Sequence, residues 1–437
     1  MDRYEKINLH CKGKVDTMEN EKSRRRGKRM KKKVWIIGGG ASGMMAAITA
    51  AKEGMDVTIA EHMDRVGKKI LSTGNGRCNM TNLSLRPEHY RSSQKLFPMK
   101  VLDRFSVWDT LNFFDSIGIV TKNRNGYIYP NSDQAASVLD ALRFETEHLG
   151  VQTVLSCHIK KAWKMKNGMF TVESDQGTFK VDSLILAAGS KAAPVSGSDG
   201  SGYDLAKSFG HTIIKPLPAL VQLKCKGTFF KQLAGVRCEA VVRLMSDGKT
   251  LAADEGEVQL TDYGISGIPT FQVSRYAACA LDEGRQVSAV LDFFPSKSME
   301  DTRSMLKQRK AALGYRPSGE FLNGVLNKKL AAVLLKQAGI PMNLTCDRLK
   351  DAQLDTLTMQ LKKFEVPVTS TNSFEQAQVC CGGVDTRDIR PDTLESKLVK
   401  GLFLVGELTD VDGICGGYNL QWAWSTGAVA GTTAGRI

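Results

Sequence analysis

Residues 34–61 read VWIIGGGASGMMAAITAAKEGMDVTIAE, and this stretch decides the fold class of the chain. The apolar run at residues 34–37 is typical of a buried strand in a parallel sheet. A Gly-rich turn follows, then an Ala-rich stretch without Pro that predicts a helix, then a second strand. That strand ends at Glu61, whose carboxylate can accept hydrogen bonds from ribose hydroxyls. The order of these parts predicts a dinucleotide-binding α/β unit.

The Gly-x-Gly-x-x-Gly turn supplies the candidate phosphate site. Gly38 permits the tight turn, Gly40 lets the backbone approach a pyrophosphate, and Gly43 lets helix and strand pack closely. Ala41 and Ser42 stand between these glycines, where the amino end of the helix would face the phosphates. We therefore expect Gly38, Gly40, Ser42 and Gly43 at the pyrophosphate, with Ala41 also among the cofactor-binding residues.

A membrane segment is the rival interpretation of the same stretch. Lys31 to Lys33 precede the uncharged residues 34–51, as in a signal peptide or a short span. The segment holds four Gly together with Ser42 and Thr49, and it has no convincing cleavage site. We therefore expect no membrane insertion here.

The net charge of +14 is unevenly placed along the 437 residues. Residues 1–33 hold 13 Lys and Arg against 5 Asp and Glu. This basic extension lacks apolar periodicity and is expected to be disordered. One interpretation is binding to nucleic acid or an anionic surface. The other, which we favour, is that translation starts at Met30 and that Arg24 to Arg29 are a ribosome-binding site read in frame.

The cysteines are expected to be free thiols, because the spacing of the Cys and His residues suits neither a disulfide scaffold nor a metal centre. The ten Cys are scattered, with no CxxC pair and no Cys/His spacing suited to zinc. We expect no metal, and the simplest location is the reducing cytoplasm. Cys78 and Cys415 are candidate redox partners of a cofactor, and vicinal Cys380 and Cys381 could form a disulfide; buried packing is the alternative for each.

In the rest of the chain, the predicted type of secondary structure changes twice. Up to residue 214, helices are expected at 101–114 and 135–149, and strands at 126–130, 151–159 and 182–190. Residues 215–295 read as antiparallel strands interrupted at 264–269. Amphipathic helices at 299–312, 321–338 and 352–363 predict a small helical domain over residues 296–365. Residues 366–437 return to strands and a final helix at 418–434, so both ends of the chain would form one doubly wound unit around an insertion.

The closing segment favours FAD over NAD. An apolar strand leads to Gly406 and Asp410, then to a Gly-rich loop and a helix. Asp410 can hold ribityl hydroxyls, and the amino end of the helix can face the flavin edge where negative charge develops. An ordinary strand–helix crossover is the alternative for this segment taken alone.

Several strings resemble one family over nearly the whole chain. They are GRCNMTN (76–82), YGISG (263–267), CGGV (381–384) and GGYNLQ (416–421). They resemble the YhiN-type, aminoacetone-oxidase-like FAD-binding oxidoreductases, which include a reductase of the bile-acid pathway. The resemblance implies a non-covalent FAD in a Rossmann-like domain formed by both ends of the chain, with an inserted antiparallel β domain carrying a small helical domain. Cys415 departs from the small residues expected before Gly416.

The resemblance also implies further cofactor-binding residues. They are Gly76, Arg77, Ile159, Gly189, Gly406, Asp410, Asn419 and Leu420. Arg77 would balance phosphate charge or contact the flavin, although it could instead pin its own loop. Ile159 would present backbone to the adenine, although a plain core Ile is the alternative.

The resemblance also implies an activity, the reduction of an activated C=C bond by NADH or NADPH. It implies a hydrophobic substrate, with 3-oxo bile-acid Δ4/Δ6 intermediates as the example. The sequence names no catalytic residue, and Tyr263 and Tyr418 are candidate proton donors only because they lie in the recognised loops. We expect a small-molecule substrate and no nucleic-acid or membrane partner. A flavin oxidase of small amines or alcohols, and a flavin-containing RNA-binding or RNA-modifying protein, are the alternatives.

Overall fold

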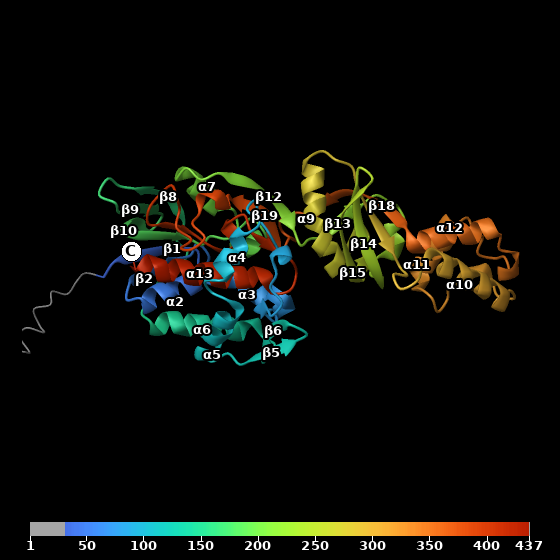
Figure 1. Ribbon diagram of the computed structural model, residues 1–437, viewed down its shortest axis with the longest axis horizontal. Coiled ribbons are helices and arrows are strands. Elements are labelled where there is room, and N and C mark those ends of the chain that lie inside the picture. Colours follow the sequence, from blue (N-terminus) through green and yellow to red (C-terminus); the bar gives the residue numbers. More distant parts are fainter. Residues whose placement is uncertain (1–30, 437) are drawn as a thin grey trace, which may run out of the picture.

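The computed structural model describes residues 31–436, and the predicted extension lies almost entirely outside this range. The described chain is elongated, with a larger α/β unit at one end, a β-barrel next to it and helices at the far end (Figure 1). No helix in residues 31–436 has the length and apolar character needed to cross a membrane.

A five-stranded parallel sheet forms the centre of the larger unit, which we call the cofactor unit. Its strands, in spatial order, are β20 (Leu402–Leu404), β11 (Ser183–Leu186), β1 (Lys33–Ile37), β2 (Asp56–Ala60) and β7 (Gln152–Val154). Ile36 of β1 pairs with Ile185 on one side and with Ile59 on the other. The outer strand β20 comes from the last part of the chain, so the prediction that both ends build one unit is confirmed.

Two helices from opposite ends of the chain pack side by side on this sheet (Figure 1). They are α2 (Ala41–Lys52) and α13 (Tyr418–Arg436). A Cβ atom on Gly427 would lie 2.4 Å from the Ser42 carbonyl oxygen, and one on Gly431 would lie 2.3 Å from that of Ala46. Glycine on α13 therefore lets the two helix backbones approach closely.

The remainder of the cofactor unit is built from short elements around this core. They are α3 (Lys68–Ser72), β3 (Thr81–Asn82), β4 (Tyr90–Arg91), α4 (Phe97–Leu102), α5 (Val107–Ser116), β5 (Thr121–Arg124), β6 (Tyr127–Pro130), α6 (Ala135–His148), β8 (Ile159–Lys164), β9 (Phe170–Ser174), β10 (Gly177–Val181), α7 (Ser201–Ser208) and β21 (Asp412–Gly413). The single helix predicted at 101–114 is wrong, because Ser106 forms a capping box that begins α5 as a separate helix. The strand predicted at 126–130 does form, as β6, and it lies between β3 and β5.

The inserted β region is a closed barrel. Its order is β13 (Leu223–Cys225), β16 (Gly264–Gly267), β15 (Lys249–Leu260), β14 (Arg237–Ser246), β17 (Val287–Asp292) and β18 (Phe364–Thr371), with antiparallel pairing. The predicted interruption at 264–269 is wrong: Gly264–Gly267 is a barrel strand, and the helix α9 (Ile268–Asp282) follows it directly. Pro269 suggests a break in the secondary structure, but the first turn of a helix tolerates Pro.

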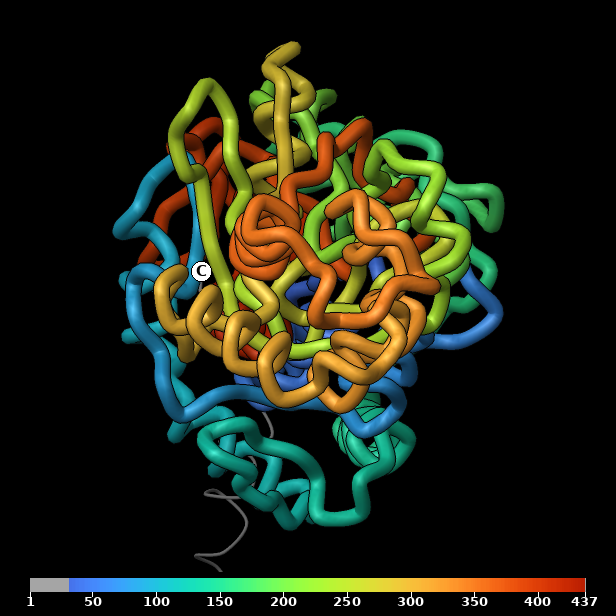
Figure 2. The backbone as a smooth tube through the Cα atoms, turned by 90° about the vertical axis from the view of Figure 1, so that its right-hand side faces the viewer, coloured from blue at the N-terminus to red at the C-terminus, as the bar shows by residue number. Residues whose placement is uncertain are grey.

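Three helices cover the far end of the barrel, as Figure 2 shows from that side. They are α10 (Met299–Ala312), α11 (Lys328–Gln337) and α12 (Asp351–Lys362). The helix predicted at 321–338 begins only at Lys328, since Asn327 caps it. Side chains of these helices and of the barrel form one hydrophobic core, so we call barrel and helices together the inserted unit.

Two strands connect the units. β12 (Ile213–Ala219) pairs with β19 (Val379–Val384) in an antiparallel ribbon that is part of neither larger sheet. A four-residue helix, α8 (Phe230–Leu233), lies inside the inserted unit.

Candidate functional site

A cavity of about 860 Å³ lies where the strands β1, β2 and β11 end. In parallel α/β sheets, ligands bind outside the carboxyl ends of the strands. Ten of the fourteen predicted cofactor residues line the cavity: Gly38, Gly40, Ala41, Ser42, Glu61, Arg77, Ile159, Gly189, Asn419 and Leu420. Gly43, Gly76, Gly406 and Asp410 do not line it.

The three glycines of the first turn occupy different surroundings. Gly38 has φ +105°, and a Cβ atom there would lie 2.5 Å from the Ala187 carbonyl oxygen. A Cβ atom on Gly43 would lie only 1.9 Å from the Gly38 carbonyl oxygen. Gly40 is the exception, because its Cβ position has no protein atom within 4 Å and faces the cavity. The Gly-rich turn therefore leaves room for a ligand at Gly40, while Gly43 keeps α2 close to the turn.

Two helix amino ends face the cavity. Gly40 is the N-cap of α2, and no side chain caps that helix. The Gly416–Gly417 loop leads into α13, and Asn419 and Leu420 of its first turn line the cavity. Neither first turn contains an acidic side chain. Both ends therefore present positive partial charge where a pyrophosphate and an electron-rich ring edge need it.

Glu61 is buried at the end of β2 and held by backbone. Its carboxylate accepts hydrogen bonds from the Gly39 N–H at 2.7 Å and from the Met63 N–H at 2.9 Å. Each carboxylate oxygen has further acceptor capacity, and the residue lines the cavity. This position fits the predicted bond to ribose hydroxyls.

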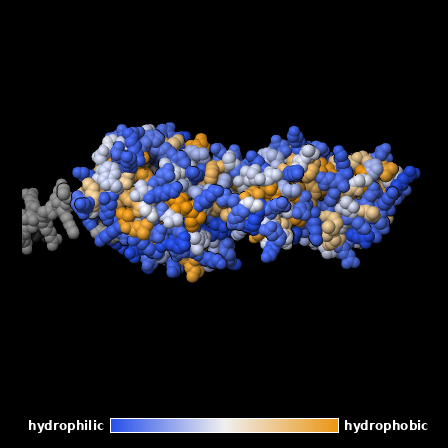
Figure 3. Space-filling model, turned by 90° about the horizontal axis from the view of Figure 1, so that it is seen from above, coloured by the Kyte–Doolittle hydropathy of each residue, from blue (hydrophilic) through white to orange (hydrophobic). Residues whose placement is uncertain are grey.

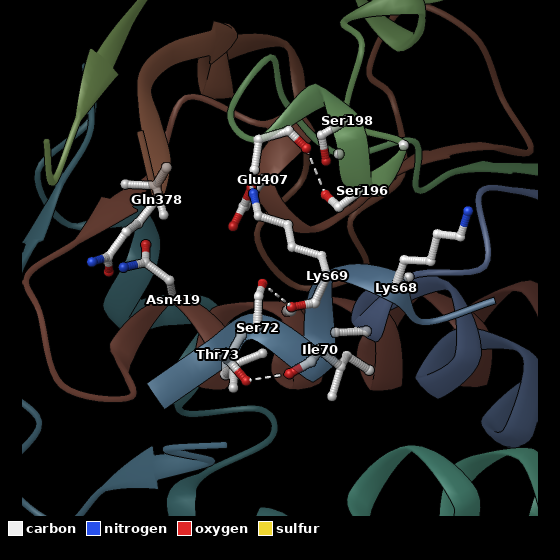
Figure 4. Close-up of a pocket in the computed structure, with 18 of the residues that line it drawn as sticks. Lys68, Lys69, Ile70, Ser72, Thr73, Ser196, Ser198, Gln378, Glu407 and Asn419 are labelled. Atoms are coloured by element: carbon white, nitrogen blue, oxygen red, sulfur yellow. Dashed lines mark hydrogen bonds and ion pairs between the residues drawn. The ribbon is translucent and has the colours of Figure 1, made fainter. Parts of the chain in front are cut away.

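The cavity contains an ion pair that was not predicted from the sequence. Lys69 Nζ lies 2.5 Å from Glu407 Oε2 and also donates to the Ala192 carbonyl at 3.3 Å. Figure 4 shows Lys69 reaching toward Glu407, whereas Lys68 extends the other way. Ser190 Oγ donates to the same Glu407 oxygen at 3.1 Å. Glu407 follows Gly406, which the sequence did mark, but nothing in the sequence pairs residues as far apart as Lys69 and Glu407.

We expect Lys69→Met to weaken FAD binding by about tenfold, roughly 1.4 kcal/mol. Without the ammonium group, the Glu407 carboxylate would leave an uncompensated negative charge in the cavity that is predicted to hold the phosphates of the cofactor. Lys307→Met is the control, since Lys307 does not line the cavity and pairs with Asp351, whose side chain is 66% exposed. Fluorescence titration of the flavin-free protein with FAD measures both affinities. Equal losses in the two variants would contradict the assignment.

Four predicted residues support the cavity from outside. Gly43 packs α2 against the turn, and Gly76 has φ +81° in the turn before Arg77. Gly406 accepts a hydrogen bond from the Trp422 indole, and a Cβ atom there would lie 2.5 Å from Ser42 Oγ. Asp410 is buried and accepts from the Ser93 N–H at 2.8 Å; burial raises the pKa of its carboxyl. A direct bond from Asp410 to the ribityl chain stays a prediction.

The inserted unit supplies one wall of the cavity. Ile268, Phe271 and Gln272 of α9 line it together with Leu220. Ile268 is 61% exposed, and Gln272 Oε1 accepts from the Cys415 N–H at 2.9 Å. This wall could not be predicted from the sequence, because the start of α9 reads as an interruption between strands.

The two tyrosines considered as proton donors lie apart from the cavity lining. The Tyr418 hydroxyl donates to the Ser84 carbonyl at 3.0 Å, and burial raises the pKa of this phenol to about 12. The Tyr263 hydroxyl accepts from Asn372 at 3.0 Å. Tyr127 and Tyr129 line the cavity instead. In residues 31–436, no group of three His, Cys, Asp or Glu side chains is arranged to hold a metal ion.

A Rossmann-like unit closed by both ends of the chain, with a ligand cavity between two helix amino ends, defines an FAD-binding oxidoreductase. The family of the HI0933-like protein Rossmann domain matches residues 32–433. The chain belongs to this family, which confirms the family resemblance seen in its motifs.

Individual relatives cover almost the whole chain. A 3-dehydro-bile acid delta(4,6)-reductase of Clostridium scindens is 46% identical over 404 residues, which is 92% of this chain and 98% of the relative. Ribosomal RNA dihydrouridine synthases of Haemophilus influenzae and Escherichia coli are 29% and 30% identical, over 90% of this chain and 95% of each relative.

Proposed function

We propose that this flavoprotein uses NADH or NADPH to reduce ring C=C bonds conjugated to a ketone, with 3-oxo Δ4 and Δ4,6 bile acids as substrates. The observation that carries the proposal is the 46% identity, over 98% of its length, to a 3-dehydro-bile acid delta(4,6)-reductase. Bound FAD would supply the hydride-transfer chemistry between nucleotide and substrate.

The apolar part of the cavity lining is suited to a flat apolar substrate. The part that faces the inserted unit is lined by Leu220, Ile268 and Phe271, with Tyr127 among the residues from the cofactor unit. These side chains can cover the face of a ring system and exclude water, while Gln272 and Gln378 offer amide groups that can orient a carbonyl. The apolar wall would thereby hold the reacting double bond beside the cofactor.

The nucleotide would share the same cavity. The sequence contains no second Gly-x-Gly-x-x-Gly with its own strand and acid. A separate nucleotide domain is therefore not part of the proposal, and the nucleotide would leave before the substrate enters.

The second candidate is saturation of uridine in RNA, favoured by the two ribosomal RNA dihydrouridine synthases among the relatives. Dihydrouridine and a reduced dienone are both products of adding two hydrogens to a ring double bond next to a carbonyl. The reaction type is thus common to the two candidates, and the acceptor distinguishes them. The higher identity to the bile-acid enzyme makes the steroid the leading proposal.

An anaerobic experiment tests the proposal with the purified yellow protein. We expect NADH or NADPH to bleach it, and a 3-oxo-Δ4,6 steroid dienone to restore the colour at least about tenfold faster than oxygen or ribosomal RNA does. Failure of both nucleotides to bleach the protein would reject a nucleotide-dependent reductase. Recovery with undermodified ribosomal RNA alone would favour the second candidate, and recovery with oxygen alone would favour an oxidase.

A further inference from the structure

Helix α9 has two faces that serve different units. Val273, Ala277 and Ala280 are buried in the core of the inserted unit. Gln272, Arg275 and Cys279 are only half-buried and recur at intervals of three and four residues, so they form one stripe on the other face.

The same side of α9 is bound to the cofactor unit and to the connecting ribbon. Gln272 accepts from the Cys415 N–H, and Arg275 Nε lies 2.9 Å from both carboxylate oxygens of Asp412. Asp282, one turn beyond Cys279, pairs with Lys215 of the connecting ribbon at 2.5 Å. The molecule narrows where the two units meet (Figure 3), and α9 lies at this junction (Figure 1).

Cys279 continues the stripe and meets a second thiol. Its Sγ lies 3.9 Å from Cys381 Sγ, on strand β19 of the connecting ribbon. Cys381 is 2% exposed, and its Sγ also lies 3.7 Å from the Leu217 carbonyl oxygen. The two sulfurs are already in contact, and an S–S bond would bring them to roughly 2 Å.

The two thiols differ in character. The hydrogen bond shared with Cys381 lowers the pKa of Cys279, and the Arg275 guanidinium adds to this effect against the opposing effect of burial. Burial raises the pKa of the half-buried thiols Cys225 and Cys238 to about 12. Cys279 is therefore the more acidic of the two paired thiols, and it is more exposed than Cys381.

The neighbouring Cys380 is not equivalent. Successive side chains of a strand point to opposite faces, and Cys380 packs with Ala192, Val221 and Ala377 in a separate apolar cluster. Cys381 packs instead in the cluster that Cys279 and Cys415 adjoin. The geometry thus pairs Cys381 with a cysteine 102 positions away, rather than with its sequence neighbour.

We propose that Cys279 and Cys381 form a reversible dithiol–disulfide site that accepts low-molecular-weight disulfides as oxidants. The Cys279 thiolate attacks one sulfur of R–S–S–R, forming a mixed disulfide and releasing RS⁻. Cys381 then loses its proton and attacks Sγ of Cys279, which forms the internal disulfide and releases the second RS⁻. Two protein thiols are oxidised, one small disulfide is reduced to two thiols, and no other reactant is needed.

The bond would fix the junction of the two units. It would join α9 covalently to β19, two helical turns from Phe271 and Gln272, which line the cavity. The site therefore links the thiol–disulfide state of the surroundings to the wall of the cavity that the inserted unit supplies.

Non-reducing peptide mapping tests the site on the FAD-loaded, pre-reduced protein treated with oxidised glutathione. We expect loss of two thiols per chain and a cross-link between the peptides that contain Cys279 and Cys381, both reversed by dithiothreitol. The cross-link should disappear in Cys279→Ser and Cys381→Ser and persist in Cys380→Ser, the matched control. A cross-link lost only in Cys380→Ser, a glutathione adduct that stays on Cys279, or no oxidation would overturn the proposal.

Alkylation of the wild-type protein provides a test that needs no variant. We expect iodoacetamide at pH 7 to modify Cys279 at least about tenfold faster than Cys225 or Cys238, because the rate follows the thiolate fraction. Equal rates at the three positions would overturn the assignment of Cys279 as the attacking thiol.

Discussion

Gly43→Ala should destabilise the protein by about 3 kcal/mol or more, whereas Gly40→Ala should leave the stability of the cofactor-free protein within about 0.5 kcal/mol of wild type. The new methyl group of Gly43→Ala would lie 1.9 Å from the Gly38 carbonyl oxygen, a backbone atom that cannot move without opening the turn. The methyl group of Gly40→Ala meets no protein atom within 4 Å. Gly40 also has φ −78°, which alanine adopts freely.

The two variants should exchange their order when FAD binding is measured. The Gly40→Ala methyl group points into the space where the cofactor backbone contact is predicted, so we expect FAD affinity to fall by about tenfold or more. Thermal unfolding of the flavin-free proteins and FAD titration separate the two effects. Wild-type affinity in Gly40→Ala would contradict the position assigned to the pyrophosphate, and wild-type unfolding in Gly43→Ala would contradict the close helix–turn contact.

The same glycines show why local parts of the site could be predicted from sequence. A turn, a helix amino end and an acid after the next strand are specified within residues 34–61, and the structure places them together around the cavity. The closing strand and α13 could be predicted as well, because apolar runs and Gly-rich loops mark them locally. Their pairing with the first unit was predicted from the order of elements along the chain, and the family resemblance implied it as well.

Features that depend on contacts between distant segments could not be predicted. Lys69 and Glu407 are separated by 338 positions, and Cys279 and Cys381 by 102. A hydrophobic pattern reports which face of an element is buried, but not which element covers it. Helix α9 was missed for a local reason: Gly267 and Pro269 resemble a turn, although they end a strand and begin a helix.

Arg275→Met should destabilise the protein by about 3–5 kcal/mol at pH 8, since it leaves a buried carboxylate without its partner. Asp412 is 3% exposed, and burial raises the pKa of its carboxyl to about 6 despite the opposing attraction of Arg275 and Arg91; Asp410 adds to the rise. Arg275 is held at 2.9 Å by both oxygens of this carboxylate, across the junction of the two units. Arg285→Met is the matched control, because its partner Glu283 is 62% exposed and such pairs contribute less than about 1 kcal/mol.

The pH dependence of this loss follows from the raised pKa of Asp412. A carboxyl whose folded-state pKa lies above its unfolded value favours folding most below about pH 4, and this contribution is lost as the pH rises through about 6. Removing Arg275 raises the folded-state pKa further, so the variant should lose more stability at pH 8 than at pH 5, where Asp412 binds a proton. Denaturant unfolding at both pH values measures the difference. The double variant Arg275→Met/Asp412→Asn removes the carboxylate charge as well, so it should recover most of the stability lost at pH 8. An equal loss at both pH values, or no recovery in the double variant, would contradict this explanation. Either result would show that Arg275 stabilises the junction by packing rather than by compensating the charge of Asp412.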